Sequence, residues 1–295
     1  MSIKAVYTIK FFFSFIFLCG IFLNEKAGAT NADSLFLSGN YFEASIEFEY
    51  LIFKAEQPDS VNLFKYKKAL CYKKLNDFNK ALEELQSIYF DNPGNDSLYR
   101  FVSYEQSLCF YLNGEPQKAL WKIDEYFHLN SDSASYVDFM PIRIFCLNEN
   151  FQWNDARQCL LAFVQMQDLT PENKTELEHL INELYHKKNV PKIRSVKKAE
   201  LLSRIIPGTG QIYGGMTGEG IVNFLINASI IAFTAHQAYN GFYITGYLAG
   251  LGFFNKTYHG GIKRAEIIAV DKNKELIANL NSWIITLISS GSNSN

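Results

Sequence analysis

The hydrophobic pattern divides the chain into two regions. Between Asp33 and Lys188, apolar residues recur at the three- and four-residue spacing of amphipathic helices, and no stretch alternates as a strand does. After Pro207 the apolar residues become nearly continuous, from Ile221 to Ala235 and again from Phe242 to Phe254. The pattern therefore predicts an all-helical protein, with a water-soluble helical region followed by a short membrane hairpin.

One short pattern returns four times in the first region. A small residue is followed four positions later by a large apolar residue, and three positions further on by another. The small residues are Ala44, Ala81, Ala119 and Ala156, which lie 37, 38 and 37 positions apart. Small side chains let paired helices approach closely, and the larger ones fill the space between them.

This pattern resembles the tetratricopeptide family, whose helix–turn–helix repeats have a nominal period of about 34 residues. The resemblance implies a helical solenoid of four repeats, the first and last degenerate, with a capping helix from Glu172 to His186. Cys71, Cys109 and Cys146 fall at one equivalent position in successive repeats. We expect them to pack as small buried side chains; disulfides in an oxidising compartment are the alternative.

In this family the concave side usually holds peptides, so the register predicts a partner-binding face. Its residues are Leu63, Tyr66, Leu70, Phe101, Tyr104, Leu108, Tyr111, Leu112 and Phe145. An exposed face this rich in tyrosine would anchor a protein partner. The alternative is that a short array closes on its own core, or receives the helix from Ile277 to Ile288, and buries the same residues.

A glycine-rich stretch from Ile206 to Gly220 joins the two regions. It contains six glycines and one proline, which oppose a helix interior, so we expect a structured turn. A phosphate-binding loop is excluded because Tyr213 breaks the dinucleotide fingerprint and Gly215-Met216 stands where a P-loop has Lys-Ser/Thr.

The same stretch, Pro-Gly-x-Gly-Gln-x-Tyr-x-Gly, precedes two apolar segments and resembles the two-transmembrane-helix hairpin domain of bacterial envelope proteins. The resemblance covers Lys197 to Asn273 and implies a membrane hairpin rather than a reaction. The residues expected to pack this hairpin are Pro207, Gly208, Gly210, Asn223, Asn227, Gly246 and Gly250.

Within the hairpin, the two asparagines should pack against the small-x-x-x-small pair Gly246 and Gly250, because buried amides in lipid need hydrogen-bond partners. The apolar stretch from Ile221 to Ala235 would rise about 22 Å against a hydrocarbon thickness of about 30 Å. We therefore expect a shallow or tilted hairpin. The spacing of Ile277, Leu280 and Ile284 predicts a further amphipathic helix at the membrane interface.

The first 29 residues have the pattern of a signal peptide, with Lys4 and Lys10 before the apolar run from Phe11 to Leu23 and a small-residue site ending at Ala29. Cleavage after Ala29 would place the repeats outside the cytoplasm, in the periplasm of a bacterial cell envelope. An uncleaved anchor is the alternative. The basic stretch 187–204 conflicts with this orientation under the positive-inside rule, and we follow the signal pattern because charges near the first span dominate.

Composition narrows the function further. The net charge of −2 gives no basic field for nucleic acid. No Ser/His/Asp, Cys/His or paired-carboxylate arrangement stands out, so no catalytic residue, metal ligand or cofactor is predicted.

The predicted domains are a signal peptide (1–29), a repeat domain (30–188), a basic linker with a juxtamembrane helix (189–205), a glycine-rich turn with the hairpin (206–261) and an amphipathic C-terminal helix with a tail (262–295).

These features predict a non-enzymatic scaffold that is tethered to the membrane lipid and binds a protein partner. The alternative is an oligomerising hairpin protein that assists transport or membrane-protein insertion, with the repeats as its regulator. An enzyme is the third class considered.

Overall fold

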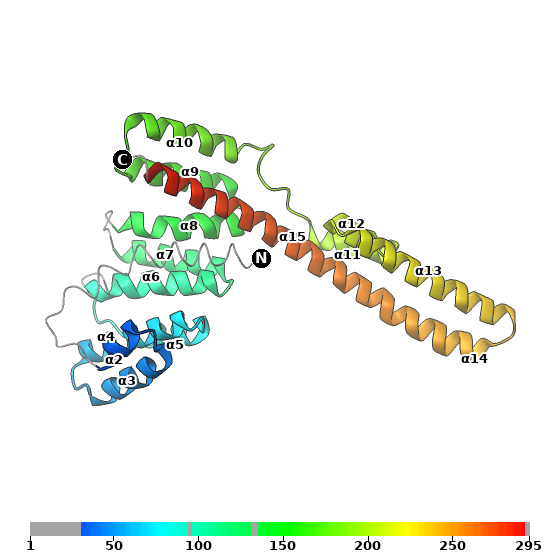
Figure 1. Cartoon of the computed structure of the whole chain (residues 1–295), viewed down its shortest axis with the longest axis horizontal. Coiled ribbons are helices and arrows are strands. Elements are labelled where there is room, and N and C mark those ends of the chain that lie inside the picture. Colours follow the sequence, from blue (N-terminus) through cyan, green and yellow to red (C-terminus); the bar gives the residue numbers. More distant parts are fainter. Residues whose placement is uncertain (1–30, 94–95, 131–134, 293–295) are drawn as a thin grey trace. The chain divides into compact units, whose positions relative to one another are not determined.

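The computed structural model describes residues 31–93, 96–130 and 135–292, in which all regular structure is helical (Figure 1). The all-helical prediction is therefore confirmed. The predicted signal peptide lies outside the described residues. The described chain forms two compact units. We call the described residues of 31–190, together with Leu287–Ser292, the repeat unit, and Pro191–Thr286 the hairpin unit.

The repeat unit consists of helices that contact one another in chain order. They are α2 (Asn31–Leu37), α3 (Tyr41–Lys54), α4 (Pro58–Lys74), α5 (Phe78–Gln86), α6 (Ser97–Leu112), α7 (Pro116–Leu129), α8 (Tyr136–Glu149), α9 (Trp153–Met166) and α10 (Pro171–Leu184). Alternate helices also meet, α4 with α6 and α6 with α8. Helix α10 follows the fourth pair, and the Tyr185 hydroxyl at its end donates to Asn148 Oδ1 at 2.9 Å.

The same backbone turn joins the two helices of each pair. The residues with positive φ are Gly39 (87°), Asn76 (61°), Gly114 (80°) and Phe151 (61°). In each turn, the N–H of the following residue bonds to a carbonyl five positions earlier, as Asp77 does to Tyr72 at 3.0 Å and Gln152 to Leu147 at 2.9 Å. This is the hydrogen bond of a Schellman helix end, which a left-handed residue makes possible. The backbone therefore repeats with the same 37- and 38-residue spacing as the alanines.

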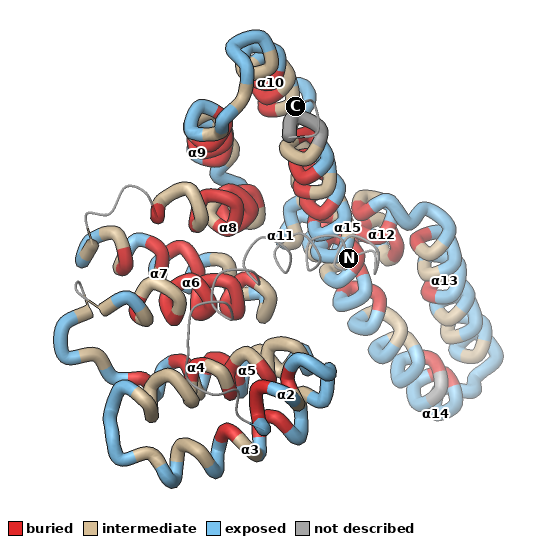
Figure 2. Tube along the Cα trace, turned by 60° about the vertical axis from the view of Figure 1, so that its left-hand side comes forward, coloured by how far each residue is buried: buried red, intermediate tan, exposed pale blue. Residues whose placement is uncertain are grey.

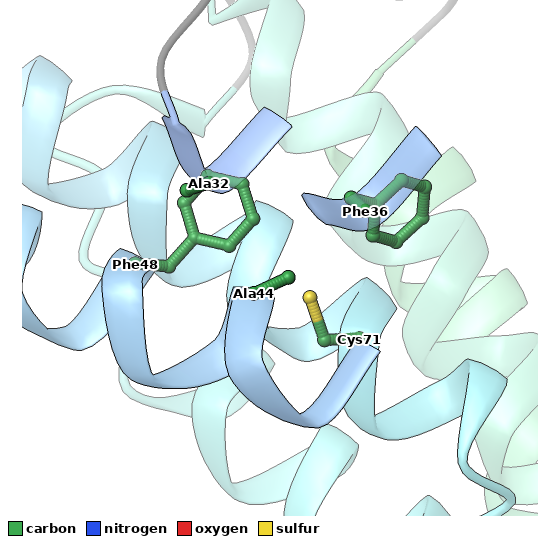
Figure 3. Packing of buried hydrophobic residues seen from close by; sticks show 5 residues of the cluster. All are labelled: Ala32, Phe36, Ala44, Phe48 and Cys71. Atoms are coloured by element: carbon green, nitrogen blue, oxygen red, sulfur yellow. The ribbon is translucent and has the colours of Figure 1, made fainter. Parts of the chain in front are cut away.

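The four pattern alanines, Ala44, Ala81, Ala119 and Ala156, are each 0% exposed. Figure 3 shows the first of them, where Ala44 and Phe48 of α3 meet Phe36 of α2 and Cys71 of α4. The cysteines at 71, 109 and 146 are buried free thiols, as the packing interpretation predicted. The two helices of each pair therefore approach closely at the pattern alanine, which lies in the core of that pair.

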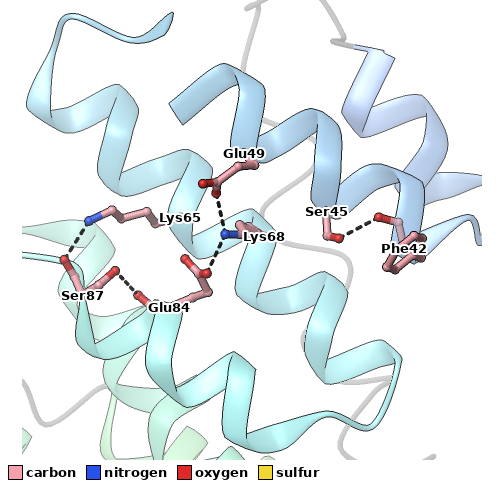
Figure 4. Close-up of polar contacts among 7 residues, drawn as sticks. All are labelled: Phe42, Ser45, Glu49, Lys65, Lys68, Glu84 and Ser87. Atoms are coloured by element: carbon pink, nitrogen blue, oxygen red, sulfur yellow. Dashed lines mark hydrogen bonds and ion pairs between the residues drawn. The ribbon is translucent and has the colours of Figure 1, made fainter. Parts of the chain in front are cut away.

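Polar contacts also link these helices. Lys68 of α4 lies between two carboxylates, with its Nζ 2.5 Å from Glu49 of α3 and 2.6 Å from Glu84 of α5 (Figure 4). Burial lowers the pKa of Lys68, but the hydrogen bonds to the two glutamates outweigh that effect and raise the pKa above its usual value. One cation thus bridges three consecutive helices.

The hairpin unit differs from the sequence prediction in two respects. Its helices are α11 (Val196–Ile205), α12 (Thr209–Gly214), α13 (Thr217–Tyr239), the short α14 (Tyr243–Thr245), a π-helical stretch η2 (Gly246–Leu251) and α15 (Gly252–Ser292). The glycine-rich stretch, predicted to be a turn, holds α12 and the start of α13. The C-terminal helix, predicted to begin at residue 262, is the continuation of α15, which runs through Gly260 and Gly261 without a break.

The end of α15 carries the apolar residues singled out in the sequence. Ile277, Leu280 and Ile284, whose spacing predicted an amphipathic helix, are buried residues of α15. The side chain beside them, Trp283, is 46% exposed. Amphipathic spacing shows which side of a helix is apolar but does not distinguish burial in protein from burial in lipid.

Candidate functional site

The glycine-rich stretch is built as a joint between four helices, and we call Pro207–Gly220 the glycine joint. Gly208 (φ 96°) and Gly215 (φ 103°) take the left-handed conformation that L side chains rarely adopt, one before α12 and one after it. Thr209 Oγ1 donates to the carbonyl of Leu202 at 2.6 Å and so satisfies the end of α11. The chain can therefore reverse twice within a few residues.

The other glycines of the joint allow close backbone contact. A β-carbon on Gly220 would lie 2.5 Å from the carbonyl oxygen of Gly208, and one on Gly214 would lie 2.5 Å from Ile268 Cγ2. A β-carbon on Gly210 would lie 2.8 Å from the Ala265 side chain. Such distances leave no room for any side chain, so the motif glycines permit α12 to pack between α11, α13 and α15.

The motif glutamine is buried, and both ends of its side-chain amide are hydrogen-bonded. Gln211 is 1% exposed; its Oε1 accepts from Ser203 Oγ at 3.1 Å, and its Nε2 donates to the Gly261 carbonyl at 3.1 Å. The Ser203 hydroxyl in turn accepts the N–H of Gly210 at 3.1 Å. A buried amide costs free energy unless it is hydrogen-bonded, and here each partner is supplied by a different helix or turn. Gln211 therefore ties α11 and α12 to α15.

A second polar clamp holds the entry to α11. The backbone N–H of Arg194 donates to Asn273 Oδ1 at 2.7 Å, and Asn273 Nδ2 donates to the Arg194 carbonyl at 2.8 Å. The Tyr213 hydroxyl accepts the N–H of Ser195 at 3.1 Å, and its ring lies 5.3 Å from the charged groups of Arg194 and Lys198. The basic segment is thus fixed on the motif tyrosine by cation–π contacts.

Beyond the joint, α13 and the returning helix form an antiparallel pair whose register is set by small and polar residues. Four pairs of residues are in contact between the two helices. From the turn of the hairpin toward the glycine joint they are Gly250 with Thr234, Thr257 with Asn227, Gly261 with Asn223, and Arg264 with Glu219. Each step along one helix is matched by an almost equal step along the other.

The predicted asparagines are at this interface, but they do not meet the predicted glycines. Asn227 is 1% exposed and donates to the side chain of Asn223 at 2.7 Å, while Thr257 Oγ1 donates to Asn227 Oδ1 at 2.9 Å. Gly250 contacts Thr234 instead, and Gly246 has only ordinary contacts, the nearest at 3.4 Å. Sequence reasoning missed Thr234, Thr257 and Gly261; the seven- and four-residue spacing from Gly250 to Gly261 was the signal that could have found them.

Helix α13 is long and apolar enough to cross a membrane. Its 23 residues extend about 34 Å, which exceeds a hydrocarbon thickness of about 30 Å, so it is longer than the apolar stretch alone predicted. Most of its surface is exposed, including Leu225, Ile231 and Phe233. Among the described helices, α13 is the one whose length and composition suit a membrane span.

The predicted partner-binding face is not an exposed surface. Five of its nine residues are buried: Tyr66, Tyr104, Leu108, Tyr111 and Phe145. The rings of Tyr104 and Phe139 meet edge to face with centroids 5.5 Å apart, and those of Tyr111 and Phe145 stack at 6.2 Å. The remaining four, Leu63, Leu70, Phe101 and Leu112, are partly buried. The prediction of an open aromatic groove is therefore wrong for the buried five. For Tyr104, Tyr111 and Phe145 the reason is that rings of α6 pack against rings of α8.

Comparisons with known proteins give no further assignment. No family model, curated protein or solved structure matches this chain. Inferences about its function therefore rest on the geometry of the two units.

Proposed function

We propose that this protein is a membrane-tethered scaffold of the bacterial cell envelope, in which the hairpin holds a tetratricopeptide-like solenoid at the membrane surface. The observation that carries the proposal is the combination of four helical pairs with one repeated turn and an apolar, largely exposed α13. Repeat arrays of this kind present extended surfaces to partners. The glycine joint supports the scaffold proposal, because its polar groups form hydrogen bonds that hold helices of the hairpin unit together.

The signal-peptide pattern supports an extracytoplasmic orientation of the scaffold. A cleaved signal peptide ending at Ala29 would leave the repeats on the extracytoplasmic side, and the basic residues before the hairpin would then lie against anionic headgroups. Protection of the repeat unit from protease in intact spheroplasts would contradict this orientation.

A fractionation experiment tests the tether. The full chain should remain with membranes after a high-salt wash, whereas Leu225→Asp with Phe233→Asp should release it, because each charge at a helix centre costs about 2.5–3.5 kcal/mol in lipid. Trp121→Asp, at a side chain of the repeat unit that is 64% exposed, is the matched control and should leave the protein in the membrane. Retention of the double variant would mean that α13 is not the anchor.

One observation favours the alternative, an oligomerising hairpin that assists transport or insertion. Asn255, Lys256 and His259 are exposed on α15, and the contact of Thr257 with Asn227 puts them beside the middle of α13. A fully inserted monomer would expose these polar groups to lipid at a high cost, which contact with a second copy or shallow insertion would avoid. Disulfide crosslinking of a Lys256→Cys variant in native membranes would distinguish the two: a crosslinked dimer supports the oligomer, and its absence supports shallow insertion.

A further inference from the structure

Helix α3 carries an exposed apolar face, which we call the α3 face. It consists of Phe42, Ile46, Tyr50 and Phe53, which are 61%, 55%, 51% and 87% exposed. Spacings of four, four and three residues place these side chains in one row along the helix. The opposite side, with Ala44 and Phe48, is buried in the core (Figure 3). Figure 2 shows the mixture of exposed and buried positions along α3. The helix is therefore apolar on both sides, although only one side packs.

The other repeats provide an internal comparison. The positions equivalent to the α3 face are Asn79, Glu83, Ser87 and Phe90 in the second repeat, Gln117, Trp121, Glu125 and His128 in the third, and Asn154, Gln158, Ala162 and Gln165 in the fourth. Of these twelve residues, two are large and apolar, Phe90 and Trp121. The repeat pattern itself thus keeps this side polar, and the α3 face is a departure confined to the first repeat.

Carboxylates surround the α3 face. At 100° per residue, Glu43 and Glu47 flank one side of the row and Glu49 the other. Within residues 31–93, no ion pair involves Glu43 or Glu47, whereas Glu49 shares Lys68 with Glu84. The one basic residue of the helix, Lys54, lies over the Tyr50 ring at 4.3 Å. The surface is thus an apolar row with an acidic rim.

We propose that the α3 face binds a basic amphipathic helix of a protein partner. The apolar side of such a helix would cover the row, and its lysines or arginines would meet the carboxylates of the rim. An acidic rim disfavours an anionic lipid surface as the occupant. This proposal rests on the proposed scaffold function and specifies its docking surface and the chemistry of its partner.

The test uses the full-length protein in detergent and two fluorescent synthetic peptides. Both form amphipathic helices with leucines along one side; one carries lysines on its flanks, and the other carries glutamates at the same positions. Fluorescence anisotropy measures the dissociation constant of each. The lysine peptide should bind at least about tenfold more tightly than the glutamate peptide, because charge complementarity determines the preference.

Variants then locate the binding surface. Ile46→Gln with Phe53→Gln should weaken binding of the lysine peptide at least about tenfold, since truncating buried apolar anchors has effects of this size. Trp121→Gln, at the position of the third repeat equivalent to Ile46, is the matched control and should leave binding unchanged. Glu43→Lys with Glu47→Lys should reverse the preference between the peptides. A thermal melt confirms that each variant remains folded.

Three results would overturn the proposal: no binding of the lysine peptide, equal binding of both peptides, or binding that survives Ile46→Gln with Phe53→Gln. A homodimer that the same double substitution dissociates would also overturn it, because a second copy would then occupy the face. All of these variants should stay in the membrane fraction. Loss of membrane association with intact peptide binding would instead count against the tether.

Discussion

Gly208 and Gly220 lie so close that neither can carry a side chain: a β-carbon on Gly220 would lie 2.5 Å from the Gly208 carbonyl oxygen. The two residues are twelve positions apart and belong to different arms of the glycine joint. Their contact holds the first turn of α13 against the residue that precedes α12. Glycine is therefore required at both positions of the motif so that the two backbones can pack this closely.

Gly220→Ala should lower the thermal stability of the detergent-solubilised protein, because the added methyl group forces the two backbones apart at a typical cost of about 1–3 kcal/mol. Gly218→Ala is the matched control, since a β-carbon there would meet no atom within 4 Å. Equal melting temperatures for the two variants would contradict the close contact.

Gly250→Ala should destabilise the hairpin more than Gly246→Ala. A β-carbon on Gly250 would lie 2.8 Å from Thr234 Cβ, whereas one on Gly246 would have its nearest contact at 3.4 Å. Small residues allow two helices to approach closely, so loss of that close approach at Gly250 should be measurable. Protease resistance and melting in detergent provide the readout, and a larger effect at Gly246 would refute the register.

Phe151→Asn should stabilise the repeat unit. Phe151 has a φ of 61°, a conformation that costs an ordinary residue roughly 1–2 kcal/mol and that asparagine tolerates better. Asn76 occupies the equivalent turn of the second repeat with the same φ. A gain of about 1 kcal/mol would raise the melting temperature by about 2–4 °C. A lower melting temperature would show that the Phe151 ring contributes more than the strain removes.

Tyr104→Ala with Tyr111→Ala should unfold the repeat unit at a lower temperature. Both rings are buried and pack on phenylalanines of α8, and truncating a buried aromatic side chain costs about 3–5 kcal/mol. Tyr89→Ala is the control, because Tyr89 is 75% exposed. An unchanged melt of the double variant would restore the interpretation of these residues as an open partner groove.

Cys71 and Cys109 should resist alkylation in the folded protein. Burial raises the pKa of each thiol to about 12, so at pH 8 roughly one molecule in ten thousand carries a thiolate, which is the reactive form. Mass mapping after iodoacetamide treatment should find both cysteines unmodified until denaturant is added. Rapid labelling of the native protein at pH 8 would disprove their burial.

The sequence by itself determined the features that depend on local spacing. The alanines at 44, 81, 119 and 156 predicted the buried centre of each pair because a helix brings residues four apart onto one side, and all four are buried. The all-helical class and the apolar α13 followed from the same periodicity. The glycines of the joint were recognised, although their sequence could not say which backbone each one approaches.

The tertiary structure alone decided which neighbours meet. Tyr104 and Tyr111 have the same local pattern whether they line a groove or a core, and contact with Phe139 and Phe145, more than thirty residues away, buries them. Asn227 likewise needed a partner, but only the antiparallel register selected Thr257 rather than Gly246 or Gly250. Helical periodicity is set by backbone geometry within one turn, whereas burial and hydrogen-bond partners depend on packing between distant segments, which a single sequence does not encode locally.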